Sequence, residues 1–482
     1  MMAFLAQHLD FALLIGYLIL QVLAALAAIH AVMNARTAQG SVAWLIALLA
    51  IPVVALPFYA AFGRHRFVGY VDAHRAGNAA VEHVTGAESR RQGQRFRAEF
   101  PEDPARFAVY ERMAQLPFSS GNEAELLIDG EAMFKALFAG ISRAEDYVLV
   151  QFYIIRDDDT GQELRRHLEA ALTRGVRVYL LFDAIGSSSL PRRYTDALIA
   201  AGAQVHAFAG TRWAVKHLQI NFRNHRKLVV VDGKELFIGG FNVGDDYLGR
   251  YPALSPWRDT HVRVRGPAAI AAQIPFLEDW FWASGELPTV HWEPQPASQS
   301  NQRVLVLPGG PADSRDTCGL FFLQAIHAAR HRLWIVSPYF VPNSSIIDAL
   351  QLAALRGVDV RILLPQRADS RLVQLAGYAY VPELVRQGVK LYRYHEGFLH
   401  QKVLLADDDF AAIGTANLDN RSFRLNFEIL VLVADKGFAA RTGTMLEDDF
   451  ARSHQIDAAA LEGRRWWFRA AARGARLLSP IL

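Results

Sequence analysis

The stretch Asn224-His225-Arg226-Lys227-Leu228-Val229-Val230-Val231-Asp232 decides the fold, and its pattern returns as His400-Gln401-Lys402-Val403-Leu404-Leu405-Ala406-Asp407. In each copy a lysine follows the histidine by two positions, and an aspartate follows the lysine after an apolar run. The apolar run predicts a buried strand. Because side chains two apart on a strand point to the same face, we expect each histidine and its lysine to share one side of a sheet.

These residue types favour an anionic substrate. An imidazole beside a fixed positive charge suits a phosphate group, and it suits a metal cation badly because the lysine would repel it. A glycine-led segment ending in asparagine follows each copy, as Gly239-Gly240-Phe241-Asn242 and as Gly414-Thr415-Ala416-Asn417. The side chains of Asn242, Thr415 and Asn417 can donate further hydrogen bonds to phosphate oxygens. The sequence therefore predicts a phosphate site that uses no metal and no other cofactor.

One copy of His-x-Lys could be no more than polar residues at the start of a strand, because short motifs often match by chance. Two copies, each followed by glycine and asparagine, argue against that interpretation. The doubled motif resembles the HxKxxxxD pattern of the phospholipase D superfamily. Three flanking stretches make the resemblance to bacterial cardiolipin synthases more specific, and it covers almost the whole chain: Gly239 to Tyr247, Trp257 to His261, and Gly414 to Glu428.

The resemblance implies a fold and a reaction. The fold would be α/β, with two similar halves whose mixed, largely parallel sheets pack about a pseudo-twofold axis and bring both motifs to one pocket. The reaction would move a phosphatidyl group from one phosphatidylglycerol to another and release glycerol. Within the resemblance, we expect His225 to attack phosphorus and His400 to act as acid and then base.

The remaining site residues follow from the same resemblance. Lys227 and Lys402 would stabilise charge on the phosphate oxygens. We expect Asp259 and Glu428 each to orient the histidine of its own half. The last members of the catalytic motifs, by contrast, lie seven residues after their histidines, and this distance favours a structural role at the strand end; they are Asp232 and Asp407.

Composition narrows the alternatives. The chain has 482 residues and a formal net charge of +3, which gives no overall nucleic-acid signature. Cys318 is the single cysteine, so an intramolecular disulfide or a cysteine-based metal cluster is excluded.

Two stretches without charged residues, 11–33 and 42–62, are each long enough for a membrane-spanning helix. Pro52 and Pro57 interrupt the second, which could be kinked or form a shallow hairpin that does not cross. Arg64-His65-Arg66 follows, and positive residues favour the cytoplasmic side. We therefore expect a multi-pass protein of the inner (plasma) membrane with its catalytic body on the cytoplasmic side.

Internal repetition sets the expected domain borders. Strands alternate with helical patterns from about residue 107 onward, and Arg174-Gly175-Val176 is answered by Arg356-Gly357-Val358 at the end of a corresponding helix. The expected divisions are an anchor, a linker and two phospholipase D-like halves: 1–66, 67–105, 106–295 and 296–482.

Two basic and aromatic segments predict further membrane contacts. Thr211 to His217 could meet lipid headgroups or pack as an ordinary loop. Arg464 to Leu478 predicts a surface helix attracted to anionic lipid, with docking on the catalytic body as the alternative. The expected partners are phosphatidylglycerol and anionic membrane lipid rather than nucleic acid, and the oligomeric state stays open.

The rival functions are a phospholipase D that uses water or another alcohol, a tethered nuclease, and a non-catalytic scaffold.

Overall fold

The computed structural model describes residues 2–34, 38–63, 94–208, 222–252, 254–297, 299–457 and 463–479. These residues form two compact units. The first contains the three N-terminal helices, and the second contains the described residues from 94 onward except Phe222. The expected loop contact at 211–217 and most of the expected linker lie outside the described residues.

The first unit consists of α1 (Met2–Asn34), α2 (Ala38–Ala50) and α3 (Pro52–Phe62), which pack on one another. Residues 11–34 of α1 form one helix long and apolar enough to cross a membrane. A second spanning helix over 42–62 is not confirmed, because one helix ends at Ala50 and a new one begins at Pro52. A proline has no N–H and fits the first turn of a helix, so α2 and α3 are separate helices, each too short to span alone.

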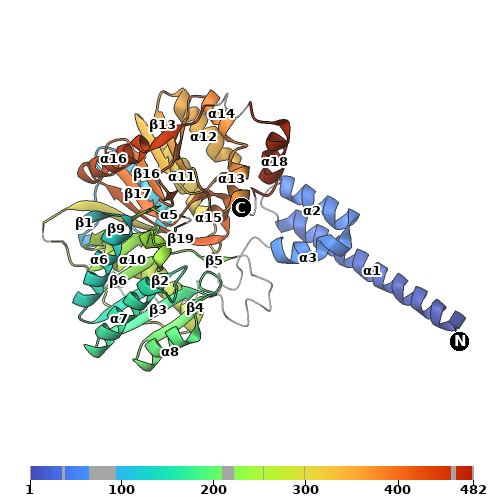
Figure 1. Ribbon diagram of the computed structural model, residues 1–482, viewed down its shortest axis with the longest axis horizontal. Coiled ribbons are helices and arrows are strands. Elements are labelled where there is room, and N and C mark those ends of the chain that lie inside the picture. Colours follow the sequence, from blue (N-terminus) through green and yellow to red (C-terminus); the bar gives the residue numbers. More distant parts are fainter. Residues whose placement is uncertain are drawn as a thin grey trace. The chain divides into compact units, whose positions relative to one another are not determined.

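The second unit begins with α5 (Pro104–Ala114) and contains the elements of both halves (Figure 1). The elements of the first half are β1 (Ser119–Ile128), α6 (Asp129–Arg143), β2 (Tyr147–Phe152), α7 (Asp159–Thr173), β3 (Arg177–Asp183), α8 (Arg192–Ala200), β4 (Gln204–Phe208), β5 (Arg223–Asn224), β6 (Leu228–Val231), β7 (Glu235–Gly239), η1 (Asp245–Leu248), β8 (Trp257–Arg258), β9 (Thr260–Arg265) and α10 (Ala268–Ser284).

The second half repeats this order with small changes. Its elements are β10 (Gln302–Gly309), α11 (Thr317–Ala328), β11 (Arg332–Val336), β12 (Phe340–Val341), α12 (Ser344–Leu355), β13 (Asp359–Pro365), α13 (Arg371–Gly377), α14 (Val381–Arg386), β14 (Lys390–Tyr394), β15 (Phe398–Leu399), β16 (Val403–Ala406), β17 (Phe410–Gly414), β18 (Leu418–Asp419), α15 (Asn420–Arg424), β19 (Asn426–Ala434), α16 (Lys436–Ala451), β20 (Ser453–Gln455) and α18 (Trp466–Arg476).

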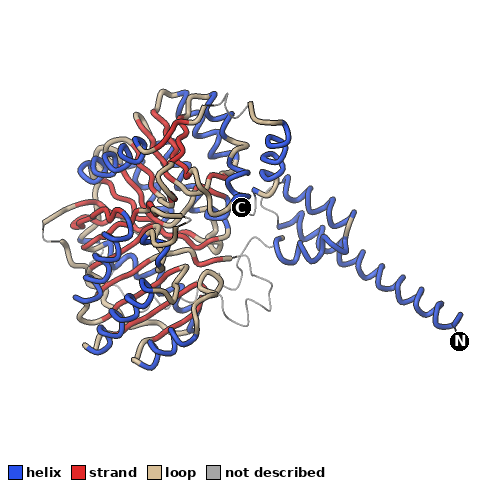
Figure 2. The backbone as a smooth tube through the Cα atoms, viewed as in Figure 1, coloured by secondary structure: helices blue, strands red, loops and turns tan. Residues whose placement is uncertain are grey.

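One hydrogen-bonded sheet runs through both halves in the order β20-β14-β13-β11-β16-β17-β19-β10-β1-β9-β7-β6-β2-β3-β4. Apart from β20, corresponding strands follow in the same order from either end, and β10 pairs with β1 at the centre. The strands fill the interior of this unit and the helices surround them (Figure 2). The predicted α/β class is confirmed.

The expectation of largely parallel sheets was wrong. Each half has one parallel run, β2-β3-β4 or β11-β13-β14, and its other pairs in the main sheet are antiparallel. The reason is local. The apolar strand after each motif turns back at once through Asp232-Gly233 or Asp407, so β6 and β7, like β16 and β17, form hairpins. A hairpin can join only antiparallel strands.

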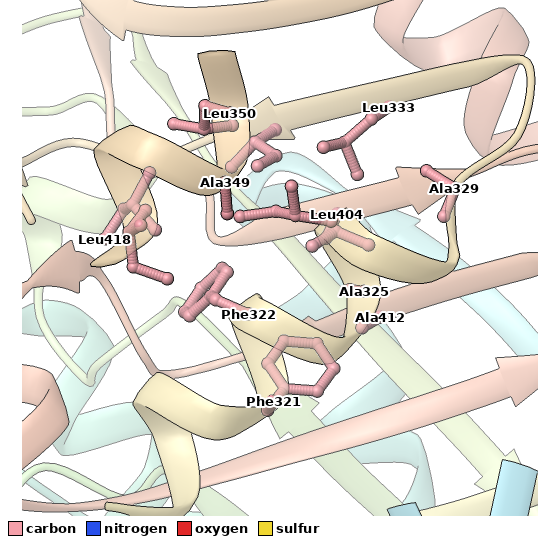
Figure 3. Close-up of a cluster of buried hydrophobic side chains, with 14 of the residues drawn as sticks. Phe321, Phe322, Ala325, Ala329, Leu333, Ala349, Leu350, Leu404, Ala412 and Leu418 are labelled. Atoms are coloured by element: carbon pink, nitrogen blue, oxygen red, sulfur yellow. The ribbon is translucent and has the colours of Figure 1, made fainter. Parts of the chain in front are cut away.

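Helices cover both faces of the sheet, which is why strands such as β2 and β6 are buried along their whole length. In the first half, the Tyr179 ring of β3 contacts the Trp280 ring of α10 at 5.3 Å, while Leu180 points into the cluster on the opposite face. In the second half, Figure 3 shows Phe321, Phe322 and their neighbours from α11 and α12 packed over Leu404 and Ala412 of the strands. The predicted glycine turns are confirmed, with φ of 87° at Gly175 and 86° at Gly357.

Candidate active site

Both motifs lie in extended segments that lead into the central strands. His225 and Lys227 precede β6, and His400 and Lys402 precede β16. Lys227 Nζ donates to the His225 carbonyl at 2.8 Å, and Lys402 Nζ donates to the His400 carbonyl. Each lysine therefore folds back over its own histidine, and the ammonium group is held beside the imidazole.

Each histidine is bound by a carboxylate from the other half. The Glu428 carboxylate accepts from His225 Nδ1 at 2.9 Å, and the Asp259 carboxylate accepts from His400 Nδ1 at 2.7 Å. Both carboxylates are fully buried. The expectation that each acid orients the histidine of its own half was therefore wrong, because the two acids are exchanged between the halves.

Short pairings between the halves cause this exchange. Strand β5, just before His225, runs parallel to the start of β19, and the His225 N–H donates to the Phe427 carbonyl at 2.9 Å. Strand β15, just before His400, pairs in the same way with β8, and the His400 N–H donates to the Arg258 carbonyl at 2.8 Å. Each histidine thus lies beside the strand that presents the acid of the opposite half.

Burial controls the charges in the site. It lowers the pKa of His225 to about 4, against the opposing effect of Glu428, and it lowers the pKa of His400 well below its usual value. The same burial lowers the pKa of Lys227 to about 7 and that of Lys402 to about 8. The charges of Lys402 and of Lys227 also lower the pKa of His400, so lysines of both motifs act on this histidine. With an ionised carboxylate on Nδ1, a neutral imidazole has a free lone pair on Nε2.

Comparison with known proteins agrees with this geometry. The profile of a family described as "Cardiolipin synthase, PLD-like domain" matches residues 137–251 and 322–450, and an N-terminal profile, "Phospholipase D-nuclease N-terminal", matches residues 22–64. Cardiolipin synthase A of Pseudomonas putida is 47% identical over 474 residues, which cover 97% of this chain and 98% of that protein.

The chain belongs to the cardiolipin synthase family of the phospholipase D superfamily. Cardiolipin synthase A of Pseudomonas aeruginosa is also 47% identical and covers 98% of this chain and 96% of that protein. Among solved structures, a phosphatidylserine synthase from Haemophilus influenzae matches with a TM-score of 0.59 at 14% identity, over 78% of this chain and all of that one. That structure shares the fold.

The aspartates that end the two family motifs bind backbone rather than the site. The Asp232 carboxylate accepts from the N–H groups of Glu145, Asp146 and Tyr147 at 2.8–2.9 Å. The Asp407 carboxylate accepts from three consecutive N–H groups at the start of β11. Both residues have positive φ, 52° and 54°, which Asp tolerates better than most residues. They hold a strand end and a turn together, so these two members of the catalytic motifs have the structural role that their spacing favours and do not contact the histidines in the described residues.

The predicted phosphate-binding residues differ in their contacts. Asn242 Oδ1 accepts from the Ile154 N–H at 3.0 Å, and Asn242 Nδ2 donates to the Tyr247 hydroxyl at 2.8 Å. The Thr415 hydroxyl accepts from the Ile429 N–H at 2.9 Å and donates to the Ile429 carbonyl at 3.3 Å, so it has little capacity left for a phosphate oxygen. Asn417 is buried, and its side-chain oxygen has no hydrogen-bond partner within the described residues.

Two buried aspartates that the sequence analysis did not single out bind residues next to the catalytic histidines. Asp279 of α10 accepts from Arg226 Nη1 and Asn224 Nδ2, each at 2.8 Å. Asp449 of α16 accepts from Arg258 and from Gln401 Nε2, both at 2.8 Å. The signal for Asp279 was an acidic residue inside the otherwise apolar sequence of α10, whereas the mixed sequence of α16 gave no such signal for Asp449.

Proposed function

We propose that this chain is a cardiolipin synthase that transfers a phosphatidyl group between two phosphatidylglycerol molecules and forms cardiolipin and glycerol. The observation that supports this most is the pair of His–Lys sets, each completed by a buried carboxylate from the other half. The close relatives carry the same name over nearly their whole length.

In the first step, His225 Nε2 bonds to phosphorus and the bond to the departing glycerol oxygen breaks. His400 gives that oxygen a proton. In the second step, the hydroxyl of the acceptor bonds to phosphorus, its proton passes to His400, and the phosphorus–nitrogen bond breaks. The charge on the phosphate oxygens is balanced by Lys227 and Lys402, with Asn242 and Asn417 as further donors. The two carboxylates stabilise the imidazolium form of their histidines.

The halves are proposed to pack about a pseudo-twofold axis, with borders at 106–295 and 296–482. The strand order, alike from either end, and the exchange of acids between the halves both support this arrangement. The border falls between α10 and β10, outside any helix or strand.

We further propose that the protein is integral to the inner membrane through α1, with its catalytic unit on the cytoplasmic side. The basic residues Arg64 and Arg66 after the apolar helices support this sidedness. Helix α18 would add a second lipid contact. Its buried residues Ala472 and Ala475 mark the docked side, whereas Trp466 and Trp467 are 75% and 53% exposed.

The products distinguish this function from its nearest rival, a hydrolase of the same fold. Purified full-length enzyme is incubated in mixed vesicles with phosphatidylglycerol labelled in its headgroup. The proposal expects cardiolipin and free glycerol in equal amounts, and neither from the His225→Ala variant. Phosphatidic acid without cardiolipin would identify a phospholipase D that uses water.

A further inference from the structure

The two halves differ two residues before each catalytic histidine. Arg223 stands before His225, and Phe398 stands before His400. Phe398 is fully buried, whereas Arg223 is half-buried. In the first half, Arg223, His225 and Lys227 therefore place three basic side chains at alternate positions. In the second half, the first of these three positions carries the phenyl ring of Phe398 instead.

Tyr153 fixes Arg223 on the catalytic side of this segment. The Tyr153 ring lies 5.1 Å from the His225 ring and 5.4 Å from Lys227 Nζ. The Tyr153 side chain is also hydrogen-bonded to Arg223. One aromatic ring thus contacts all three basic residues, which is the arrangement expected of side chains two apart on an extended chain.

Arg421 brings a second guanidinium to this place from the other half. The Leu425 N–H donates to the Arg421 carbonyl at 2.8 Å, and the Arg223 N–H donates to the Leu425 carbonyl at 3.4 Å. Burial and the charge of Arg223 lower the pKa of Arg421, while Asp419 and Glu428 raise it. Two guanidinium groups in one partly buried place can donate together to a single phosphate.

The corresponding position in the first half has the opposite charge. It is Asp246, which follows Asn242 by four positions as Arg421 follows Asn417, and it pairs with Arg156 at 2.6 Å. The two sides of the site therefore match in histidine, lysine and acid but not in the surrounding charge. A site that took two identical groups in identical ways would not need this difference.

The arginines are also partly exposed. Arg223, Arg421 and Tyr153 are half-buried, whereas Phe398, which corresponds to Arg223, is fully buried. The two catalytic histidines themselves are similarly covered, with side chains 12% exposed at His225 and 9% at His400.

We propose that Arg223 and Arg421 bind the phosphodiester of the acceptor phosphatidylglycerol while the histidines act on the phosphodiester of the donor. This rests on the proposed function. Two phosphatidylglycerols bring two phosphates, and the His–Lys sets take only one. In the acceptor, a three-carbon glycerol separates the reacting hydroxyl from the second phosphate, so that phosphate must lie close to the catalytic pocket.

The two arginines would therefore select an anionic lipid as acceptor over water or a neutral alcohol.

The test lets two acceptors compete for one phosphoenzyme. Full-length enzyme in vesicles receives phosphatidylglycerol and labelled free glycerol, and the ratio of cardiolipin to labelled phosphatidylglycerol is measured. All steps before the acceptor binds cancel in this ratio. Arg421→Gln and Arg223→Gln are compared with a control, Arg424→Gln. Arg424 lies on α15 like Arg421, but its guanidinium pairs with Asp316.

The expected result is a fall of about 10- to 100-fold in the ratio for Arg421→Gln and Arg223→Gln, the loss typical of a hydrogen-bonded charge, with recovery in Arg421→Lys. The ratio should stay unchanged in Arg424→Gln. An unchanged ratio in both glutamine variants would overturn the proposal. If Arg421→Gln lowers the unfolding temperature, the result for Arg223→Gln decides. Absence of cardiolipin from the wild-type enzyme would instead refute the proposed function itself.

Discussion

Each catalytic histidine depends on a carboxylate from the other half of the chain, and this can be tested one residue at a time. Glu428→Gln removes the negative charge that accepts from His225 Nδ1, so formation of the phosphoenzyme should slow by roughly 10²- to 10⁴-fold. Asp259→Asn weakens His400 as acid and as base, so it should slow both the formation of the phosphoenzyme and its transfer to the acceptor. Rapid-quench measurement of both steps checks this, with the exposed Glu447→Gln as control. A Glu428→Gln variant that slows only the transfer would contradict exchanged acids.

The buried lysines predict a dependence of stability on pH. The pKa of Lys227 is lowered to about 7 by burial, from a value of about 10.4 in the unfolded chain. Between these values the unfolded chain holds a proton that the folded chain has released, so a rise in pH stabilises the fold, by about 1.4 kcal/mol per pH unit. This contribution is lost as the pH falls to 7.

Denaturant unfolding of wild type and Lys227→Met at pH 7, 8 and 9 measures the effect. The free energy of unfolding of the wild type should rise relative to the variant over this range. For Lys402→Met the rise should begin one unit higher, since the pKa of Lys402 is about 8. A constant difference between wild type and either variant would mean that the lysine keeps its proton in the fold.

Among the structural elements, the strand ends depend on the aspartates of the two motifs. Asp232→Ala leaves three N–H groups at the start of β2 without their acceptor, and Asp407→Ala does the same at the start of β11. We expect each change to lower the free energy of unfolding by about 2–4 kcal/mol. The fraction that remains folded should keep a kcat within about tenfold of the wild type. A loss of activity at full stability would return these residues to the catalytic set.

The proposed contact of helix α18 with lipid can be tested with a dye attached to a new cysteine. The single native cysteine, Cys318, is buried and should not react with the dye. Ala470→Cys places a thiol on the exposed side of the helix between Trp466 and Leu477, where a polarity-sensitive dye can be attached. With full-length enzyme, the dye emission should shift to the blue in anionic vesicles and not in neutral ones. Leu352→Cys on α12 is the control. Equal spectra in both vesicles would mean that α18 does not contact anionic lipid.

At the scale of the whole molecule, the sequence could predict what depends on local pattern. The apolar runs gave the central strands, and the repeated motifs gave both His–Lys sets. The exchange of Asp259 and Glu428 could not be predicted, because spacing tells which face a side chain takes but not which distant strand packs beside it. The antiparallel hairpins were visible in Asp232-Gly233, a common turn pair. The break before Pro52 was visible too, but hydropathy alone favoured one long helix.

The central claim is that two halves of one chain place two histidines on a single phosphodiester. The most direct measurement is mass spectrometry of the enzyme quenched during turnover of phosphatidylglycerol. The account predicts a phosphatidyl adduct on His225 in the wild type, a more slowly formed adduct on the same residue in His400→Ala, and no adduct in His225→Ala. Cardiolipin formed at the wild-type rate by His225→Ala, with no adduct on either histidine, would contradict it.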